Sequence, residues 1–116
     1  MVELSVLYKN LKEYLSYARE AYNKENYNTA VTLFFKALVT ICDIEIFKRT
    51  KILPSSHDNR FRTLEARFPY LYRIVDRDFP YYTDSYRITI SKRVVDLVKK
   101  DVEKLLKEFG MDEKIK

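Results

Sequence analysis

Glycine, proline and cysteine are all scarce in this chain of 116 residues, which contains one glycine, three prolines and one cysteine. All-β sandwiches and barrels need many tight turns rich in glycine and proline, so this composition excludes them. The single cysteine cannot form an intrachain disulfide, and with the single histidine it cannot complete a structural zinc site. We therefore expect no metal site, and no cofactor.

Long hydrophobic runs are also missing, which excludes a membrane-spanning helix. The first ten residues, MVELSVLYKN, lack the basic and then apolar layout of a secretory signal. The only glycine, Gly110, cannot supply a glycine-rich phosphate loop. We expect a cytoplasmic protein that does not contact a membrane.

The chain is 47% hydrophobic and 34% charged, which is enough apolar material to bury the core of one domain. We expect a single helical bundle over residues 1–110 and a frayed, charged tail over residues 111–116.

Two long segments carry apolar residues at steps of three and four, which predicts amphipathic helices over residues 3–23 and 27–48. The break between them is short, so the two helices should be antiparallel, with Asn26 as the N-cap of the second. The second helix is apolar around most of its circumference. It should be the central element, or one of its faces should meet another subunit, and we expect a homodimer.

Three further helices follow. One should start at Ser56 or Asp58 and end at about residue 67, and the next should span residues 69–78. Pro80 then opens a segment, residues 81–87, that we expect to be an ordered loop. The last helix should begin between residues 84 and 91 and end at 109, with Gly110 as a left-handed cap. The predicted fold is all-α, an antiparallel up-down bundle of four main helices plus a short fifth.

Positive charge is concentrated in the middle of the chain. Residues 48–93 contain 11 basic and 5 acidic residues, whereas the remainder contains 11 and 12. Most of this excess is arginine, whose planar donors suit phosphate. The alternative is that these arginines are solvated and paired with neighbouring acidic residues.

Tyrosines lie among these arginines, and the combination can stack bases and bind phosphates. The alternative is that the tyrosines pack at the rim of the bundle. The candidate residues for binding a nucleotide or nucleic acid are His57, Arg60, Arg62, Arg73, Arg77, Tyr82, Tyr86 and Arg87.

His57 is also a weak catalytic candidate, because histidine titrates near neutral pH. With Arg49 or Arg60 it could serve as the general base of a metal-independent endoribonuclease. The alternative is a histidine at a helix start that bonds to backbone or solvent. Cys42, in a strongly apolar segment, is expected to be a small buried thiol.

Two resemblances to known families follow from the motifs. The first is carried by the pattern Tyr27-x-x-Ala30-x-x-x-Phe34-x-x-Ala37-Leu38. This pattern is similar to the second helix of a tetratricopeptide repeat, which would imply a structural helical adaptor. It covers barely a third of the chain, and no second copy follows.

The second resemblance covers nearly the whole chain. Three motifs follow one another along the chain: Phe35-Lys36-Ala37-Leu38, then Ser56-His57-Asp58 with Leu64, and then a tyrosine- and arginine-containing turn before a long final helix. This order of motifs resembles that of the HEPN domains of prokaryotes. That resemblance implies a HEPN-like bundle, a homodimer, and binding of nucleotide, of RNA or of a minimal nucleotidyltransferase partner. Members that cleave RNA carry Arg-x4–6-His. Seven residues separate Arg49 from His57, so the resemblance points to the non-catalytic branch.

Overall fold

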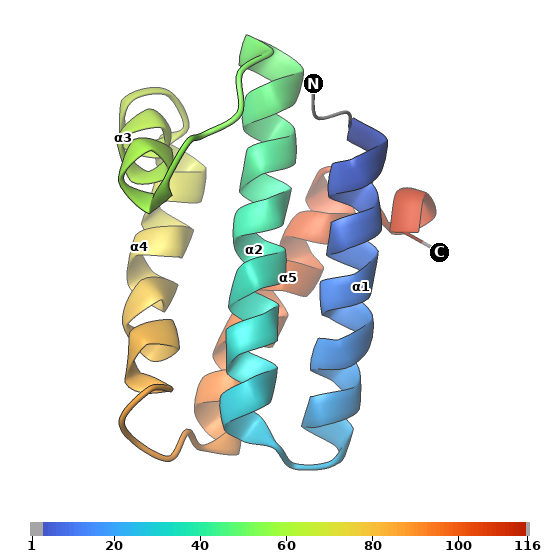
Figure 1. Ribbon diagram of the computed structural model, residues 1–116, viewed down its shortest axis with the longest axis vertical. Helices are drawn as coiled ribbons and strands as arrows, with labels where there is room; N and C mark the ends of the chain where they lie inside the picture. The colour runs from blue at the N-terminus through green and yellow to red at the C-terminus, as the bar shows by residue number, and fades with distance from the viewer. Residues whose placement is uncertain (1–3, 116) are drawn as a thin grey trace.

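Five α-helices make up residues 4–115, the part of the chain that this computed structural model describes (Figure 1). They are α1 (Leu4–Asn23), α2 (Tyr27–Thr50), α3 (His57–Arg67), α4 (Pro69–Asp84) and α5 (Lys92–Glu108), followed by the 3-10 helix η1 (Asp112–Ile115). No strand occurs among these residues, so the all-α prediction is confirmed. Residue 3, the expected first residue of α1, lies outside the described part. None of the described helices is long and apolar enough to cross a bilayer.

Helix α2 is the central element, as its apolar circumference predicts. α1 lies on one side of it, α4 on the other and α5 behind, while the short α3 packs on α4 at one end (Figure 1). α1 and α4 run antiparallel to α2. Because its own chain covers α2 on three sides, the apolar surplus of this helix does not by itself require a second subunit, and the homodimer stays a prediction.

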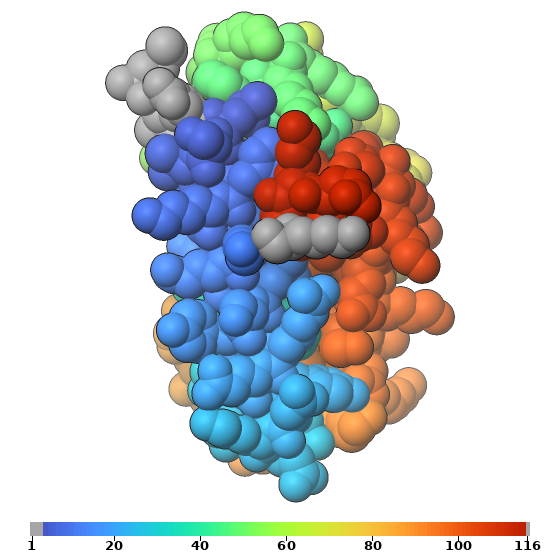
Figure 2. Space-filling model, turned by 90° about the vertical axis from the view of Figure 1, so that its right-hand side faces the viewer, coloured from blue at the N-terminus to red at the C-terminus, as the bar shows by residue number. Residues whose placement is uncertain are grey.

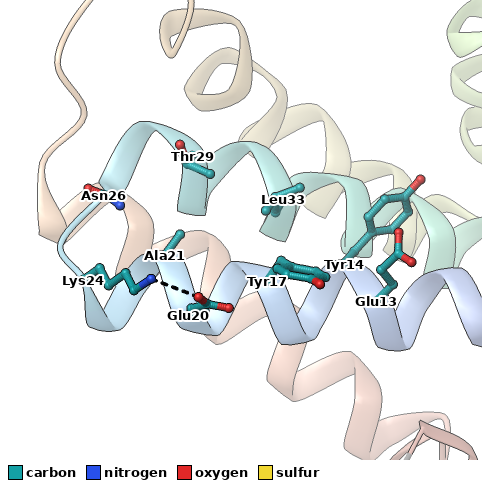
Figure 3. A pocket seen from close by; sticks show the side chains of 9 residues that line it. All are labelled: Glu13, Tyr14, Tyr17, Glu20, Ala21, Lys24, Asn26, Thr29 and Leu33. Atoms are coloured by element: carbon teal, nitrogen blue, oxygen red, sulfur yellow. Dashed lines mark hydrogen bonds and ion pairs between the residues drawn. The ribbon is translucent and has the colours of Figure 1, made fainter.

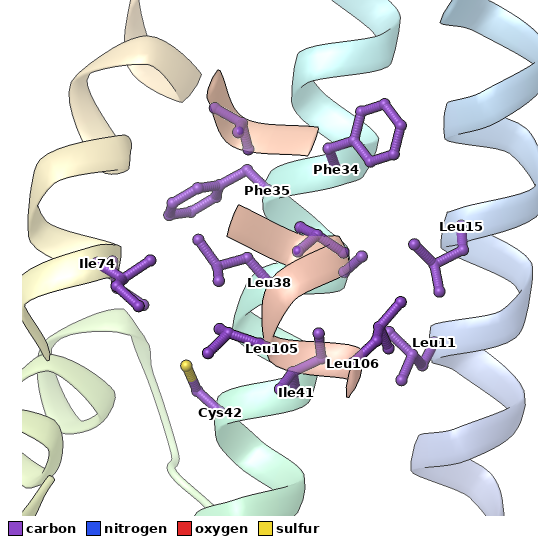
Figure 4. Packing of buried hydrophobic residues seen from close by; sticks show 14 of the residues in the cluster. Leu11, Leu15, Phe34, Phe35, Leu38, Ile41, Cys42, Ile74, Leu105 and Leu106 are labelled. Atoms are coloured by element: carbon purple, nitrogen blue, oxygen red, sulfur yellow. The ribbon is translucent and has the colours of Figure 1, made fainter. Parts of the chain in front are cut away.

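The core lies where α2 meets α1 and α5 (Figure 4). Its largest fully buried side chains include Leu11 and Leu15 of α1, Phe34, Leu38 and Ile41 of α2, and Leu105 and Leu106 of α5. Cys42 is buried there too, and burial raises the pKa of its thiol. Cys42 is therefore the small buried thiol that the sequence predicts.

Helix α4 is longer than expected. The prediction that it ends at residue 78 and that residues 81–87 form a loop is wrong, because α4 continues through Pro80 to Asp84. Pro80 cannot donate to the carbonyl of Asp76, but both residues are exposed, so water can satisfy that carbonyl. Beyond the proline, Tyr82 stacks on Phe35 of α2, with ring centroids 4.8 Å apart, and this packing holds the last turns in place.

The connection from α4 to α5 is fastened to the start of α2 by one side chain. The Asn28 amide donates to the carbonyls of Ser85 and Ile88, and its oxygen accepts from the backbone N–H of Ile90. Ser91 then caps α5, since its hydroxyl accepts from the backbone N–H of Val94. α5 starts at Lys92, one residue after the predicted interval, and ends at Glu108, one residue before the predicted end.

The ends of α1 and α5 share one backbone motif. Glu25 and Gly110 both have left-handed φ angles, 62° and 63°. Each motif is closed by two hydrogen bonds to carbonyls of the last helical turn, such as those from Gly110 to Lys107 and from Met111 to Leu106. The predicted glycine cap is confirmed. Asn26 occupies the predicted N-cap position of α2, but the predicted side-chain capping bond is absent. Its backbone N–H instead completes the motif at the end of α1.

The C-terminal segment is ordered as far as it is described, so the prediction of a frayed tail is wrong. Met111 is fully buried, and η1 packs against α1. Figure 2 shows this segment, in dark red, seated between α1 and α5. The left-handed turn at Gly110 reverses the chain and directs Met111 into the core.

Candidate functional site

A cavity of about 370 Å³ opens between α1, α2, the start of α3 and the end of α4. Three of the predicted binding residues, His57, Arg60 and Tyr82, line it together. They come from segments that are far apart in the sequence, so tertiary packing creates this cavity. Its remaining walls include Asn10 and Tyr14 of α1 and Lys36, Val39 and Asp43 of α2.

The start of α3 is fixed by two reciprocal hydrogen bonds. The Ser56 hydroxyl accepts from the backbone N–H of Asn59, and the Asn59 side chain accepts from the backbone N–H of Ser55. Of the two predicted starts, Ser56 is the N-cap, and Asp58 lies in the first turn of α3. Because α3 starts at His57, Arg60 lies one turn further along, and both side chains reach the same cavity.

Arg60 forms a bidentate ion pair with Asp43 of α2. Its Nε and Nη2 atoms lie 2.7 and 2.9 Å from the two carboxylate oxygens. The side chains are only 13% and 15% exposed, so solvent screens the pair weakly. The carboxylate largely neutralises Arg60, which therefore holds α3 against α2 and positions its neighbours.

His57 is one of those neighbours. Nη1 of Arg60 lies 3.0 Å from Nδ1 of His57. A guanidinium can only donate, so Nδ1 is the acceptor and Nε2 carries the proton of the neutral ring. His57 is exposed and lines the cavity, and with Nδ1 engaged by Arg60 its remaining polar ring atom is Nε2.

A cluster of aromatic rings lies beside His57, and two of its members, Phe35 and Tyr82, line the cavity. Phe79 lies 5.9 Å from Phe35 and 6.1 Å from Tyr82, measured between ring centroids. The hydroxyls of Tyr82 and Tyr86 lie 3.0 Å apart, and this hydrogen bond raises the pKa of Tyr82. Tyr86 is thus attached to the cavity through Tyr82, although it is 74% exposed.

The other predicted residues lie elsewhere. Arg62 lines a different hollow, between α3 and the end of α2. Arg77 donates to Asp101 of α5 at 2.6 Å, and Arg73 and Arg87 are exposed. The arginine-rich middle of the chain therefore does not converge on a single cleft.

Arg77 also borders an unusual carboxyl group. Asp78 is fully buried, and its Oδ2 has no hydrogen-bond partner among the described residues. Burial, followed by the neighbouring Asp101 carboxylate, raises the pKa of Asp78 to about 8, although the Arg77 guanidinium at 3.4 Å opposes this shift. The group is therefore largely protonated at neutral pH.

Sequence reasoning missed Asp43, Lys36 and Asn10. Asp43 did leave a signal, since it is a charged residue within the most apolar helix and needs a partner there. Nothing in the sequence identified Arg60 as that partner. Arg49, the other arginine considered beside His57, instead pairs with Glu45 and lies over the Phe68 ring.

No protein-family model, no curated protein and no solved structure matches this chain. The likeness to HEPN domains therefore rests on the sequence motifs. Among residues 4–115, no three His, Cys, Asp or Glu side chains are grouped so that they could hold a metal ion.

Proposed function

We propose that this protein is a HEPN-like helical binding module that binds a nucleotide in the cavity lined by His57, Arg60 and Tyr82. The observation that carries this proposal is the hydrogen bond between Arg60 and His57 at the wall of the cavity. Because Nδ1 accepts from Arg60, Nε2–H is the donor that remains on the ring, and the same cavity contains Lys36. Two donors of this kind suit phosphate oxygens.

The size and walls of the cavity support the same ligand class. Its volume of about 370 Å³ lies at the lower end of the range of roughly 300–1,000 Å³ for small-molecule sites. Val39 and the rings of Tyr14 and Tyr82 provide apolar contact for a base, and the Asn10 side chain can pair with its polar edge. A single nucleotide fits this set better than an extended strand, because the other predicted arginines lie outside the cavity.

Direct titration by calorimetry tests this proposal, with AMP, ATP and a short single-stranded RNA as probes. We expect the nucleotides to bind, and His57→Gln to weaken binding roughly tenfold, because the amide does not reproduce the imidazole's bond to Arg60. The matched control is Arg62→Gln, on the same helix but outside the cavity, which should bind like the wild type. No binding of any probe, or equal binding by His57→Gln, would overturn the proposal.

The salt dependence distinguishes a nucleotide from a nucleic acid. One or two phosphate contacts give a shallow decline of affinity with salt, whereas six or more give a loss of about 10³-fold or greater between 50 and 200 mM. A shallow decline supports the nucleotide. A steep one for RNA would show that the scattered arginines act together after all.

The motif order supports a second part of the proposal, a minimal nucleotidyltransferase as partner protein. We do not expect RNA cleavage, because Nδ1 of His57 is engaged by Arg60 and the Arg-x4–6-His spacing of the cleaving members is missing. Incubation of RNA with the pure protein in EDTA tests this expectation, and cleavage that His57→Ala abolishes would contradict it.

A further inference from the structure

A second hollow, of about 350 Å³, lies between α1 and the first half of α2. Its apolar lining consists of Tyr14, Tyr17 and Ala21 of α1 and Leu33 of α2. Figure 3 shows the two tyrosine rings along α1, with Leu33 across from them. Tyr17 is 58% exposed, so its ring is open to a molecule that enters the hollow. The hollow therefore offers aromatic and aliphatic contact to a small ligand.

Two carboxylates flank Tyr17 on α1. Glu13 lies one turn before it and Glu20 one turn after it, so the three side chains share one face of the helix. Glu20 is paired with Lys24 at 3.0 Å. Glu13 is exposed and has no ion-pair partner among residues 4–115. The charged residues of the hollow therefore sum to −1, which a ligand with a single positive charge would neutralise.

Elsewhere in the structure, a lysine completes the same combination of a tyrosine ring and a carboxylate. The Lys92 ammonium lies 5.4 Å from the centroid of the Tyr22 ring and 3.0 Å from the Asp96 carboxylate. Tyr8 and Tyr70 are covered in the same way by lysines that lie 5.8 and 5.7 Å from the ring centroids. Each of these lysines also pairs with a carboxylate, at 3.5 and 3.9 Å. An ammonium suits such a place because both the ring face and the carboxylate attract it.

Tyr17 has the ring and the carboxylate of this combination, but no lysine or arginine in the described part of the chain lies over its ring. We propose that the hollow binds an organic ammonium ion, a small amine with an apolar body. Its ammonium lies between the Glu13 carboxylate and the Tyr17 ring, and its apolar body packs on Ala21 and Leu33. A monoamine suits the hollow better than a polyamine, because Lys24 would repel a second positive charge.

An NMR titration of the full chain at neutral pH and constant ionic strength tests the proposal. Phenethylammonium is the probe, and phenylethanol is its uncharged counterpart of nearly the same shape. We expect the probe to shift the backbone signals of Tyr17, Ala21 and Leu33. The alcohol should bind roughly tenfold more weakly, because it has no charge to pair with Glu13. Equal binding of the two compounds, or no shift at these residues with millimolar probe, would overturn the proposal.

Two substitutions separate the contributions of the carboxylate and the ring. Glu13→Gln should weaken binding of phenethylammonium roughly tenfold, because it removes the charge and keeps the shape. Tyr17→Leu should weaken it about threefold, because the ring is lost while an apolar side chain remains. Glu65→Gln, the same change at an exposed position of α3, is the matched control and should bind like the wild type. Unchanged affinity in Glu13→Gln, or an equal loss in Glu65→Gln, would contradict the proposal. Neither Glu13 nor Tyr17 lines the His57 cavity, so the outcome is independent of nucleotide binding.

Discussion

Arg60 of α3 and Asp43 of α2 meet through two parallel hydrogen bonds of 2.7 and 2.9 Å. Each residue is the other's principal charged partner, and both are mostly shielded from solvent. This one pair joins α3 to the central helix and sets the orientation of His57. Its removal should therefore affect both the stability of the protein and its cavity.

Asp43→Ala should destabilise the protein by about 3 kcal/mol, because it leaves a guanidinium with little solvent access and no carboxylate partner. Urea denaturation measures this change. Glu103→Ala is the matched control, since it removes the more exposed Lys99–Glu103 pair and should cost less than about 1 kcal/mol. Equal costs for the two variants would show that the Arg60–Asp43 pair contributes no more than a surface ion pair.

Asp78 should make the stability of the protein depend on pH. Its pKa is about 8 in the folded chain and 3.8 in its unperturbed state, so between these values the folded state binds a proton that the unfolded state has lost. Stability should therefore fall by up to about 1.4 kcal/mol per pH unit from this group as pH rises through that window.

Asp78→Asn removes this titration and keeps a neutral side chain of similar shape. The variant should gain stability over the wild type as pH rises from 5 to about 8 in a series of urea titrations. Asp76→Asn, at an exposed position of the same helix, is the matched control for the removal of one carboxylate from α4. A difference between Asp78→Asn and the wild type that does not change with pH would mean that the buried carboxyl is not protonated in the folded state.

The left-handed residues at the ends of α1 and α5 should respond in opposite directions to substitution. Gly110→Ala should destabilise the protein by about 1 kcal/mol, because an alanine is strained at the left-handed φ angle of this position. A steric clash does not contribute, since a Cβ there meets no atom within 4 Å. Glu25→Gly should stabilise the protein by about 0.5–1 kcal/mol, because it relieves the same strain. Thermal unfolding of both variants measures these changes, and a change of the same sign in both would contradict the shared motif.

Met111 should contribute to the stability of the protein as much as a buried core residue within a helix does, because its side chain is fully buried. Met111→Ala should cost about 2–5 kcal/mol, whereas Met111→Leu, which nearly conserves volume, should cost less than about 1.5 kcal/mol. Denaturant titrations separate the two. If Met111→Ala behaved like Met111→Leu, the segment after Gly110 would not be packed as the structure shows.

Much of the fold could be predicted from the sequence because its signals are local. The spacing of apolar residues located α1, α2 and α5, and the serine and glycine caps placed several helix ends to within a residue or two. Pro80 gave the wrong end for α4, because the rule for proline describes an isolated helix, and here Phe35 and Tyr82 stack across two helices. The charged composition of residues 111–116 likewise concealed the burial of Met111.

By itself, the sequence determined the all-α class, the central place of α2 and the residue types available for binding. Only the tertiary structure decided that Asp43 meets Arg60, that His57 and Tyr82 line the same cavity, and that Arg62 and Arg77 lie outside it. The physical reason is that helical periodicity depends on neighbours three and four residues apart. Pairing across helices depends instead on the rotation and height at which each helix packs.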